Sequence, residues 1–87
     1  MFNEEFLRDL GFRDFVHLRK EKRDSLKRLT TIKIIDGQWF TIQLVKRANW
    51  DLEKIIFDGD KKIYDKYFTK DPSLEDVIFK LFVQKND

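Results

Sequence analysis

Cysteine is absent from this 87-residue sequence, which excludes disulfide bonds and thiolate metal ligands. Pro72 is the only proline and glycine occurs three times, so no Pro- or Gly-rich linker divides the chain. No apolar run approaches the roughly 20 residues of a membrane-spanning helix. The single histidine, His17, has no nearby serine, and neither a phosphate-binding glycine loop nor a zinc-protease motif occurs. We therefore expect a protein that is not an enzyme and requires no cofactor.

The composition is that of one folded domain spanning residues 1–87. Hydrophobic residues make up 41% of the chain and charged residues 39%, and the nine phenylalanines distinguish it from a disordered chain. A chain of this length holds one modest hydrophobic core. Its first residues, Met1–Glu5, are acidic and lack the basic start and apolar centre of a secretory signal. We expect a cytoplasmic protein that does not associate with membranes.

Amino acids with G/C-rich codons are also scarce. Ala48 is the only alanine, whereas lysine, isoleucine and phenylalanine, whose codons are A/T-rich, are abundant. This bias predicts an A/T-rich source genome, which is typical of low-GC bacteria and of their phages and mobile elements.

The clearest structural pattern is a β-hairpin around Asp36-Gly37. A two-residue turn would pair Ile34 with Trp39 and mix apolar and polar side chains on both faces. A three-residue loop with Gly37 in the bulge position would pair Ile34 with Gln38 and separate the faces more cleanly, so we favour it. Its apolar face holds Ile32, Ile34, Phe40, Ile42 and Leu44. Its polar face holds Thr31, Lys33, Trp39, Thr41, Gln43, Val45 and Arg47.

Helices are expected at both ends of the chain. Asn3 is suited to cap an N-terminal helix that Gly11 would end, with Phe6, Leu7 and Leu10 as its buried residues. Asp71 is predicted to be the N-cap residue of a C-terminal helix, with Pro72 in its first turn. The apolar face of that helix would hold Leu74, Val77, Ile78, Leu81 and Phe82.

Two segments have mixed patterns. Residues 13–29 are predicted to be helical, and the alternative is a strand over 15–20 followed by a short helix over 24–29. A second Asp-Gly pair at Asp58-Gly59 predicts another hairpin, although Ile63, Tyr64 and Tyr67 also recur at helical spacing. The expected fold class is α+β: an antiparallel meander of about four strands, N-terminal helical segments, and a C-terminal amphipathic helix packed on the sheet.

Positive charge is concentrated early in the chain. Residues 8–33 hold nine Lys or Arg against four acidic residues, although the whole chain has a net charge of +2. Clustered Lys and Arg side chains bind nucleic-acid phosphates, and an exposed Trp39 could stack on a base or anchor a protein partner. The competing interpretation buries Trp39 beneath residues 13–29. The candidate nucleic-acid or partner-binding residues are Arg19, Lys20, Lys22, Arg23, Lys27, Arg28, Lys33, Trp39 and Arg47.

Three functions follow as hypotheses. The first is a small binding module that associates with nucleic acid. The second is a protein-binding adaptor or inhibitor of the kind encoded by phages or mobile elements of low-GC bacteria. The third and weakest is a metal-dependent nuclease that uses Asp58, Asp60 and Lys62, with Asp65 as a further oxygen ligand; a polar turn is the simpler interpretation, so no metal site is predicted. The chain would act as a monomer or a homodimer.

Overall fold

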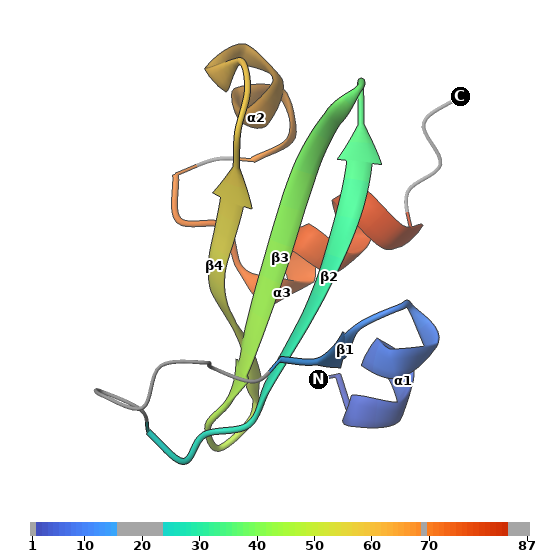
Figure 1. Ribbon diagram of the computed structural model, residues 1–87, viewed down its shortest axis with the longest axis vertical. Coiled ribbons are helices and arrows are strands. Elements are labelled where there is room, and N and C mark those ends of the chain that lie inside the picture. Colours follow the sequence, from blue (N-terminus) through green and yellow to red (C-terminus); the bar gives the residue numbers. More distant parts are fainter. Residues whose placement is uncertain (1, 16–23, 69, 84–87) are drawn as a thin grey trace.

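The computed structural model describes residues 2–15, 24–68 and 70–83, which form an antiparallel sheet with helices at its margins and across one face (Figure 1). The strands are β1 (Arg13–Asp14), β2 (Arg28–Ile35), β3 (Gln38–Lys46) and β4 (Trp50–Phe57), paired in the order β1-β2-β3-β4. The helices are α1 (Glu4–Asp9), α2 (Lys61–Tyr67) and α3 (Leu74–Ile78), which continues into the π-helix η1 (Phe79–Val83). The expected α+β class is confirmed.

The C-terminal helix packs on one face of the sheet, as the sequence predicts. In Figure 1 it lies behind β2, β3 and β4, and none of the labelled helices crosses in front of them. Its buried residues Leu74, Val77 and Ile78 join Phe40 and Ile42 of β3 in one hydrophobic core. The other members of this core are Leu7, Phe12, Leu29, Leu44, Trp50, Phe68 and Leu81. The sheet and the helices therefore form two layers. The opposite side of the sheet is exposed around Trp39, whereas Gln43 and Val45, further along the same face of β3, are buried.

The two helix starts differ in how well the sequence predicts them. At α1, the Asn3 side chain accepts a hydrogen bond from the Phe6 N–H at 2.8 Å, which confirms the predicted cap. At α3 the predicted Asp71 cap is wrong. Ser73 is the N-cap residue, and it forms a capping box with Asp76 because each side chain accepts from the other residue's backbone N–H.

The central hairpin has the two-residue turn, so the predicted three-residue loop is wrong. Ile35 pairs with Gln38 and Ile34 pairs with Trp39. Both turn residues are left-handed, with φ of 52° at Asp36 and 76° at Gly37. Such a turn matches the twist of the flanking strands, and Asp-Gly is among its preferred sequences. Turn geometry therefore outweighs the cleaner separation of side chains that the bulged register offers.

This register reverses the faces predicted for β2, because a shift of one residue turns every side chain over. Phe40, Ile42 and Leu44 lie in the core as predicted, and Trp39 points away from it. Ile32 and Ile34 join Trp39 on the open face, whereas the sequence pattern places them in the core.

A β-bulge in β4 keeps the apolar side chains of that strand directed toward the core on both sides of the bulge. Gln43 pairs with Lys54 but Leu44 pairs with Leu52, so Glu53 is the additional residue. The apolar residues of β4 change phase at this point, from Trp50 and Leu52 to Ile55 and Phe57. Because the bulge absorbs the change, all four of these residues pack in or against the core, and the Glu53 carboxylate reaches Gln43 on the opposite face.

The helix predicted over residues 13–29 is wrong wherever the structure describes it. Arg13–Asp14 form β1, residues 24–27 have no regular structure, and Arg28 begins β2. This result also excludes the alternative helix over 24–29. Asp24 instead accepts hydrogen bonds from the Leu26 N–H and the Arg28 guanidinium, which hold the chain in a turn before β2. The remaining residues of the prediction, 16–23, lie outside the described part.

The second predicted hairpin is wrong as well, because the chain after Asp58-Gly59 forms α2. Asp60 caps this helix by accepting a hydrogen bond from the Lys62 N–H at 2.9 Å. The helical spacing then places Tyr64 against the rings of Phe40 and Phe57, with centroids 6.4 and 5.6 Å away. Burial of this aromatic face outweighs the β-propensity of the segment. The four strands therefore come from 13–57, with β1 in place of the predicted last strand.

Candidate functional site

A group of large apolar side chains lies on the open face of the sheet. Trp39 and Ile34 are each 58% exposed, and they lie directly opposite each other across the hairpin. One step along the sheet, Thr41 pairs with Ile32 on one side and with Ile56 on the other. Ile32 is 53% exposed and Ile56 is 49% exposed. We call Ile32, Ile34, Trp39 and Ile56 the open-face patch.

The open-face patch is unusual because its members are contiguous. Single exposed apolar residues are common on soluble proteins, whereas groups on three adjacent strands mark interaction sites more often. Only Thr41, an uncharged residue, lies between Ile32 and Ile56. The centre of the patch is therefore apolar, a composition typical of the centre of a protein interface. The exposed Lys54, which pairs with Gln43, borders it on β4.

The same face ends in a buried ionic network at the opposite end of the strands. Arg28 is 8% exposed, and its guanidinium donates to the carboxylates of both Glu53 and Asp24. The Arg28–Glu53 contacts are 2.6 and 2.8 Å, and the Arg28–Asp24 contacts are 2.7 and 3.0 Å. Gln43 also donates to Glu53. The network ties residue 24 to β2, β3 and β4. Each partly buried charge has an oppositely charged hydrogen-bond partner, which offsets the cost of removing it from water.

Both partners in this network have shifted pKa values. The hydrogen bond from Arg28 lowers the pKa of Glu53 to about 2, and the hydrogen bond from Gln43 adds to this, against an opposing effect of burial. Hydrogen bonds to Glu53 and then to Asp24 raise the pKa of Arg28. Arg28 therefore stays charged, and its guanidinium is hydrogen-bonded to two carboxylates within the fold. Its role as a nucleic-acid contact stays a prediction.

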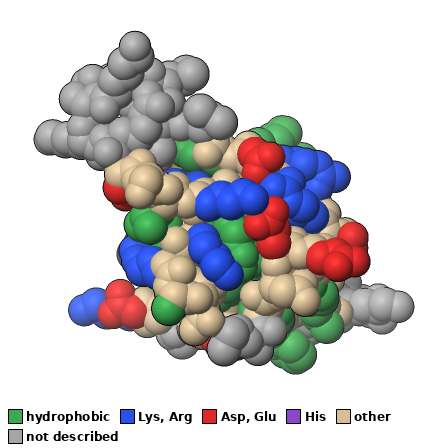
Figure 2. Space-filling view, turned by 90° about the horizontal axis from the view of Figure 1, so that it is seen from below, with side chains coloured by type: hydrophobic (Ala, Val, Ile, Leu, Met, Phe, Trp, Pro, Cys, Tyr) green, Lys and Arg blue, Asp and Glu red, His purple; other side chains and the backbone are tan. Residues whose placement is uncertain are grey.

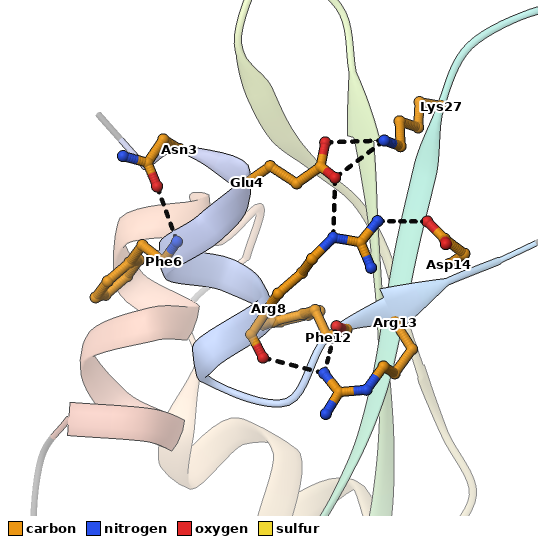
Figure 3. A network of polar contacts seen from close by, with 8 residues as sticks. All are labelled: Asn3, Glu4, Phe6, Arg8, Phe12, Arg13, Asp14 and Lys27. Atoms are coloured by element: carbon orange, nitrogen blue, oxygen red, sulfur yellow. Dashed lines mark hydrogen bonds and ion pairs between the residues drawn. The ribbon is translucent and has the colours of Figure 1, made fainter.

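A second ionic network surrounds α1 (Figure 3). Lys27 donates to the Glu4 carboxylate at 2.9 Å, and Arg8 lies between Glu4 and Asp14, at 2.9 and 2.6 Å. Hydrogen bonds from Lys27, and next from Arg8, lower the pKa of Glu4. Arg13 reaches back to the backbone oxygens of Arg8 and Phe12. Lys27, another predicted contact, therefore links α1 to the start of β2 through its ion pair with Glu4.

The remaining predicted residues do not form the basic face that the sequence predicts around Trp39. Lys33 lies on the covered side of β2, with its Nζ 4.9 Å from the ring centroid of Phe82. Arg47 follows β3 and makes an exposed ion pair with Asp51 at 3.8 Å. Trp39 is thus separated from both cations. Arg19, Lys20, Lys22 and Arg23 lie outside the described residues, as does His17.

Over the described part of the end viewed in Figure 2, Lys and Arg side chains lie beside Asp and Glu side chains. This mixture agrees with the ion pairs of Lys27, Arg28 and Arg47. Pairing of this kind reduces the local positive potential that a nucleic-acid backbone needs.

Two of the three acidic residues of the nuclease hypothesis have structural partners. Asp60 caps α2, and Asp65 accepts from Lys61 at 2.8 Å. Within residues 2–15, 24–68 and 70–83, no three His, Cys, Asp or Glu side chains lie close enough to hold a metal ion. Among the same residues, no helix is long and apolar enough to cross a membrane.

Three members of the open-face patch, Ile32, Ile34 and Ile56, are absent from the predicted site. The first two are missed because the predicted register turns β2 over. The signal that could have found them is the Asp36-Gly37 pair itself, which favours a two-residue turn and so places Ile34 opposite Trp39. Ile56 is missed because its strand neighbours Ile55 and Phe57 are also apolar, so the pattern does not show which one faces outward.

No protein-family model matches the chain, and comparison with curated proteins and with solved structures finds no match.

Proposed function

We propose that this protein is a small protein-binding module that uses the open face of its sheet to dock a partner protein. The observation that carries the proposal is the open-face patch, in which Trp39 and three isoleucines are each about half exposed or more. Burying such side chains releases roughly 25 cal/mol per Å² of apolar surface. Tryptophan is also among the residues that most often dominate binding energy at protein interfaces.

The charges of the described residues support a protein partner over a nucleic acid. Lys27 and Arg28 are held by carboxylates, and Lys33 is directed to the covered side of the sheet. A base stacked on Trp39 would therefore have few free cations nearby to neutralise its phosphates. A protein partner needs apolar contact and little charge at the centre of the interface, which the patch offers.

The proposal is tested by affinity capture from an extract of the source cells, treated with nuclease beforehand. Wild type is compared with Trp39→Ala and with a control, Phe79→Ala, which removes an equally exposed aromatic ring (57%) from the C-terminal helix. We expect one protein to be retained by wild type and by Phe79→Ala, and to be reduced at least about tenfold by Trp39→Ala. Equal capture by all three proteins would contradict the proposal.

Nucleic-acid association is the competing proposal, and the basic sequence over Arg19–Arg23 is the feature that favours it. It predicts that untreated extract yields bound nucleic acid and that retention falls steeply as salt is raised. Within the protein-binding proposal, the chain would act in the cytoplasm as an adaptor or as an inhibitor of the kind that phages and mobile elements of low-GC bacteria encode. A homodimer is tested by measuring molecular mass against concentration.

A further inference from the structure

One edge of the sheet carries backbone groups directed away from the protein. Along β2, successive residues alternate between hydrogen bonding to β3 and pointing outward. The Lys27 carbonyl accepts from Lys46 on the β3 side, whereas the Arg28 carbonyl accepts from Phe15 on the other side. Continued along the strand, this alternation directs the N–H and C=O groups of Ile32 and Ile34 outward.

Strand β1 does not reach these outward groups. It pairs only with Leu29 and Thr30, and before Arg13 the chain turns into the end of α1. The N–H of Phe12 donates to the Leu7 carbonyl, and the N–H of Gly11 donates to the Arg8 carbonyl. Within the described residues, no backbone hydrogen bond to Ile32 or Ile34 comes from this side. An unpaired edge of this kind accepts a further strand.

We propose that the partner docks by adding an extended segment to β2, with backbone hydrogen bonds to Ile32 and Ile34. This inference rests on the proposed function and names the form of the partner. The added strand would continue the line of β1, and its outward side chains would extend the apolar surface of Ile32, Ile34 and Trp39. Edge and patch adjoin, because the two residues with free backbone groups also supply two of the exposed isoleucines.

Lys33 specifies the charge of that segment. It lies between Ile32 and Ile34 and projects to the opposite side of the sheet, beside Phe82. On an added strand, the residue opposite Lys33 would face its ammonium group, and opposite charges in that position are stabilising. The segment therefore has an acidic residue between two apolar residues.

The same lysine disfavours a second copy of this chain as the occupant. A symmetric antiparallel pair that hydrogen-bonds Ile32 to the other copy's Ile34 places the two Lys33 side chains directly opposite each other. Like charges in that position are destabilising. A register centred on Ile32 would require Thr30, which already pairs with Arg13. A different protein with an apolar–acidic–apolar strand satisfies the edge without this repulsion.

The other edge of the sheet is less open. A hollow of about 280 Å³ lies beside β4, and it is lined by Asp71 and Pro72 together with Leu52–Ile55 and Tyr64. The chain before α3 thus borders the outer side of β4. The exposed β2 edge is the better acceptor, and it is continuous with the open-face patch.

The test separates the backbone edge from the side chains. Ile34→Pro removes the outward N–H and the isoleucine side chain, whereas Ile34→Ala removes the side chain alone. Because residue 34 does not donate to β3, proline is compatible with this edge position. The probe is a blocked six-residue peptide of alternating valine and glutamate, added to the labelled full-length protein at up to about 1 mM. A valine–lysine peptide of the same design is the charge control.

We expect the valine–glutamate peptide to slow amide exchange at Ile32 and Ile34 and to bind at least about tenfold more tightly than the valine–lysine peptide. Ile34→Pro should weaken binding by about tenfold more than Ile34→Ala, and Lys33→Glu should reverse the charge preference. Protection of the two wild-type amides decides the question even if Ile34→Pro does not fold.

Three results would overturn the inference: no added protection at Ile32 and Ile34, equal binding by Ile34→Pro and Ile34→Ala, or self-association that protects these amides without peptide. If Trp39→Ala still abolishes capture of the cellular partner in any of these cases, the proposed docking face stands and strand addition alone fails. If Trp39→Ala and Phe79→Ala capture equally, the proposed function itself fails.

Discussion

Ile34 and Trp39 lie directly opposite each other across the β2–β3 hairpin, and both side chains are 58% exposed. Cross-strand contact between an aromatic and a β-branched side chain stabilises a hairpin by a few tenths of a kcal/mol up to about 1 kcal/mol. That contact leaves the outer surfaces of both residues in water. The pair is therefore a small contributor to folding and the centre of the proposed docking surface.

The two tryptophans should differ sharply in their effect on stability. Trp50 is 4% exposed and belongs to the hydrophobic core, so Trp50→Ala should lower the free energy of unfolding by about 3–5 kcal/mol. Trp39→Ala should lower it by less than about 1 kcal/mol, because Trp39 contributes mainly its contact with Ile34. Urea unfolding followed by circular dichroism measures both. Comparable losses would show that Trp39 is buried.

The turn residues should report the hairpin register. Gly37 has a φ of 76° and open space around the position of a Cβ atom, so Gly37→Ala should destabilise by about 1–2 kcal/mol through backbone strain alone. Asp36→Asn is the control, because asparagine accepts the same left-handed conformation. In NMR spectra, a strong contact between the Hα atoms of Ile34 and Trp39 is expected. A contact between those of Lys33 and Trp39, the first non-hydrogen-bonded pair of the bulged register, would instead support the bulged loop.

Sequence patterns predicted the elements whose local signals agree with one another. The cap at Asn3 and the buried face of Leu74, Val77 and Ile78 follow directly from residue type and spacing. The conformation of the segment after Gly59 is harder to predict, because the same residues suit a strand or a helix. Its conformation is decided by Tyr64, whose ring packs on Phe40 and Phe57 only when the segment is helical.

Acid should destabilise the protein through Glu53. The pKa of its carboxyl group is lowered to about 2 by Arg28, from an ordinary value of 4.5. A group with a lowered folded-state pKa stabilises the fold above its unfolded pKa and loses that contribution as the pH falls through the folded value. The free energy of unfolding should therefore decline between about pH 4.5 and pH 2, and Glu53→Gln should make this decline smaller.

The same variant has an effect at neutral pH. Glu53→Gln should cost about 1–3 kcal/mol at pH 7, because it weakens charge-assisted hydrogen bonds from a buried guanidinium. Glu75→Gln makes the same chemical change at an exposed position on α3, and it serves as the control. Unfolding curves over the acid range compare the three proteins. Parallel pH profiles for wild type and Glu53→Gln would contradict the assigned role of Arg28.

The start of α3 should depend on Ser73 and not on Asp71. Ser73→Ala removes one side of the capping box and should cost about 1 kcal/mol. Asp71 has a φ of 57°, so Asp71→Gly relieves a left-handed residue and should leave the stability unchanged or slightly higher. Thermal unfolding measures both, and a larger loss for Asp71→Gly would restore Asp71 as the cap.

The candidate site could be predicted only in part. Trp39 was identified as a residue facing away from the core, because β3 alternates clearly. Its neighbours Ile32 and Ile34 are not predicted on that face, because the pattern places the charged Lys33 there instead. In the structure the long side chain of Lys33 extends along the covered face to the ring of Phe82. Residue type likewise indicated Arg28 as a surface cation, and only the fold brings Glu53 and Asp24 around it.

The most direct test is the solvent exposure of Trp39 with and without the captured protein, measured by acrylamide quenching of fluorescence in a Trp50→Phe variant. In that variant Trp39 is the only tryptophan. We expect strong quenching and red-shifted emission for the free protein, and reduced quenching with a blue shift in the complex. Emission from Trp39 that is already shielded in the free protein, or that stays equally quenchable in the complex, would contradict docking on the open face.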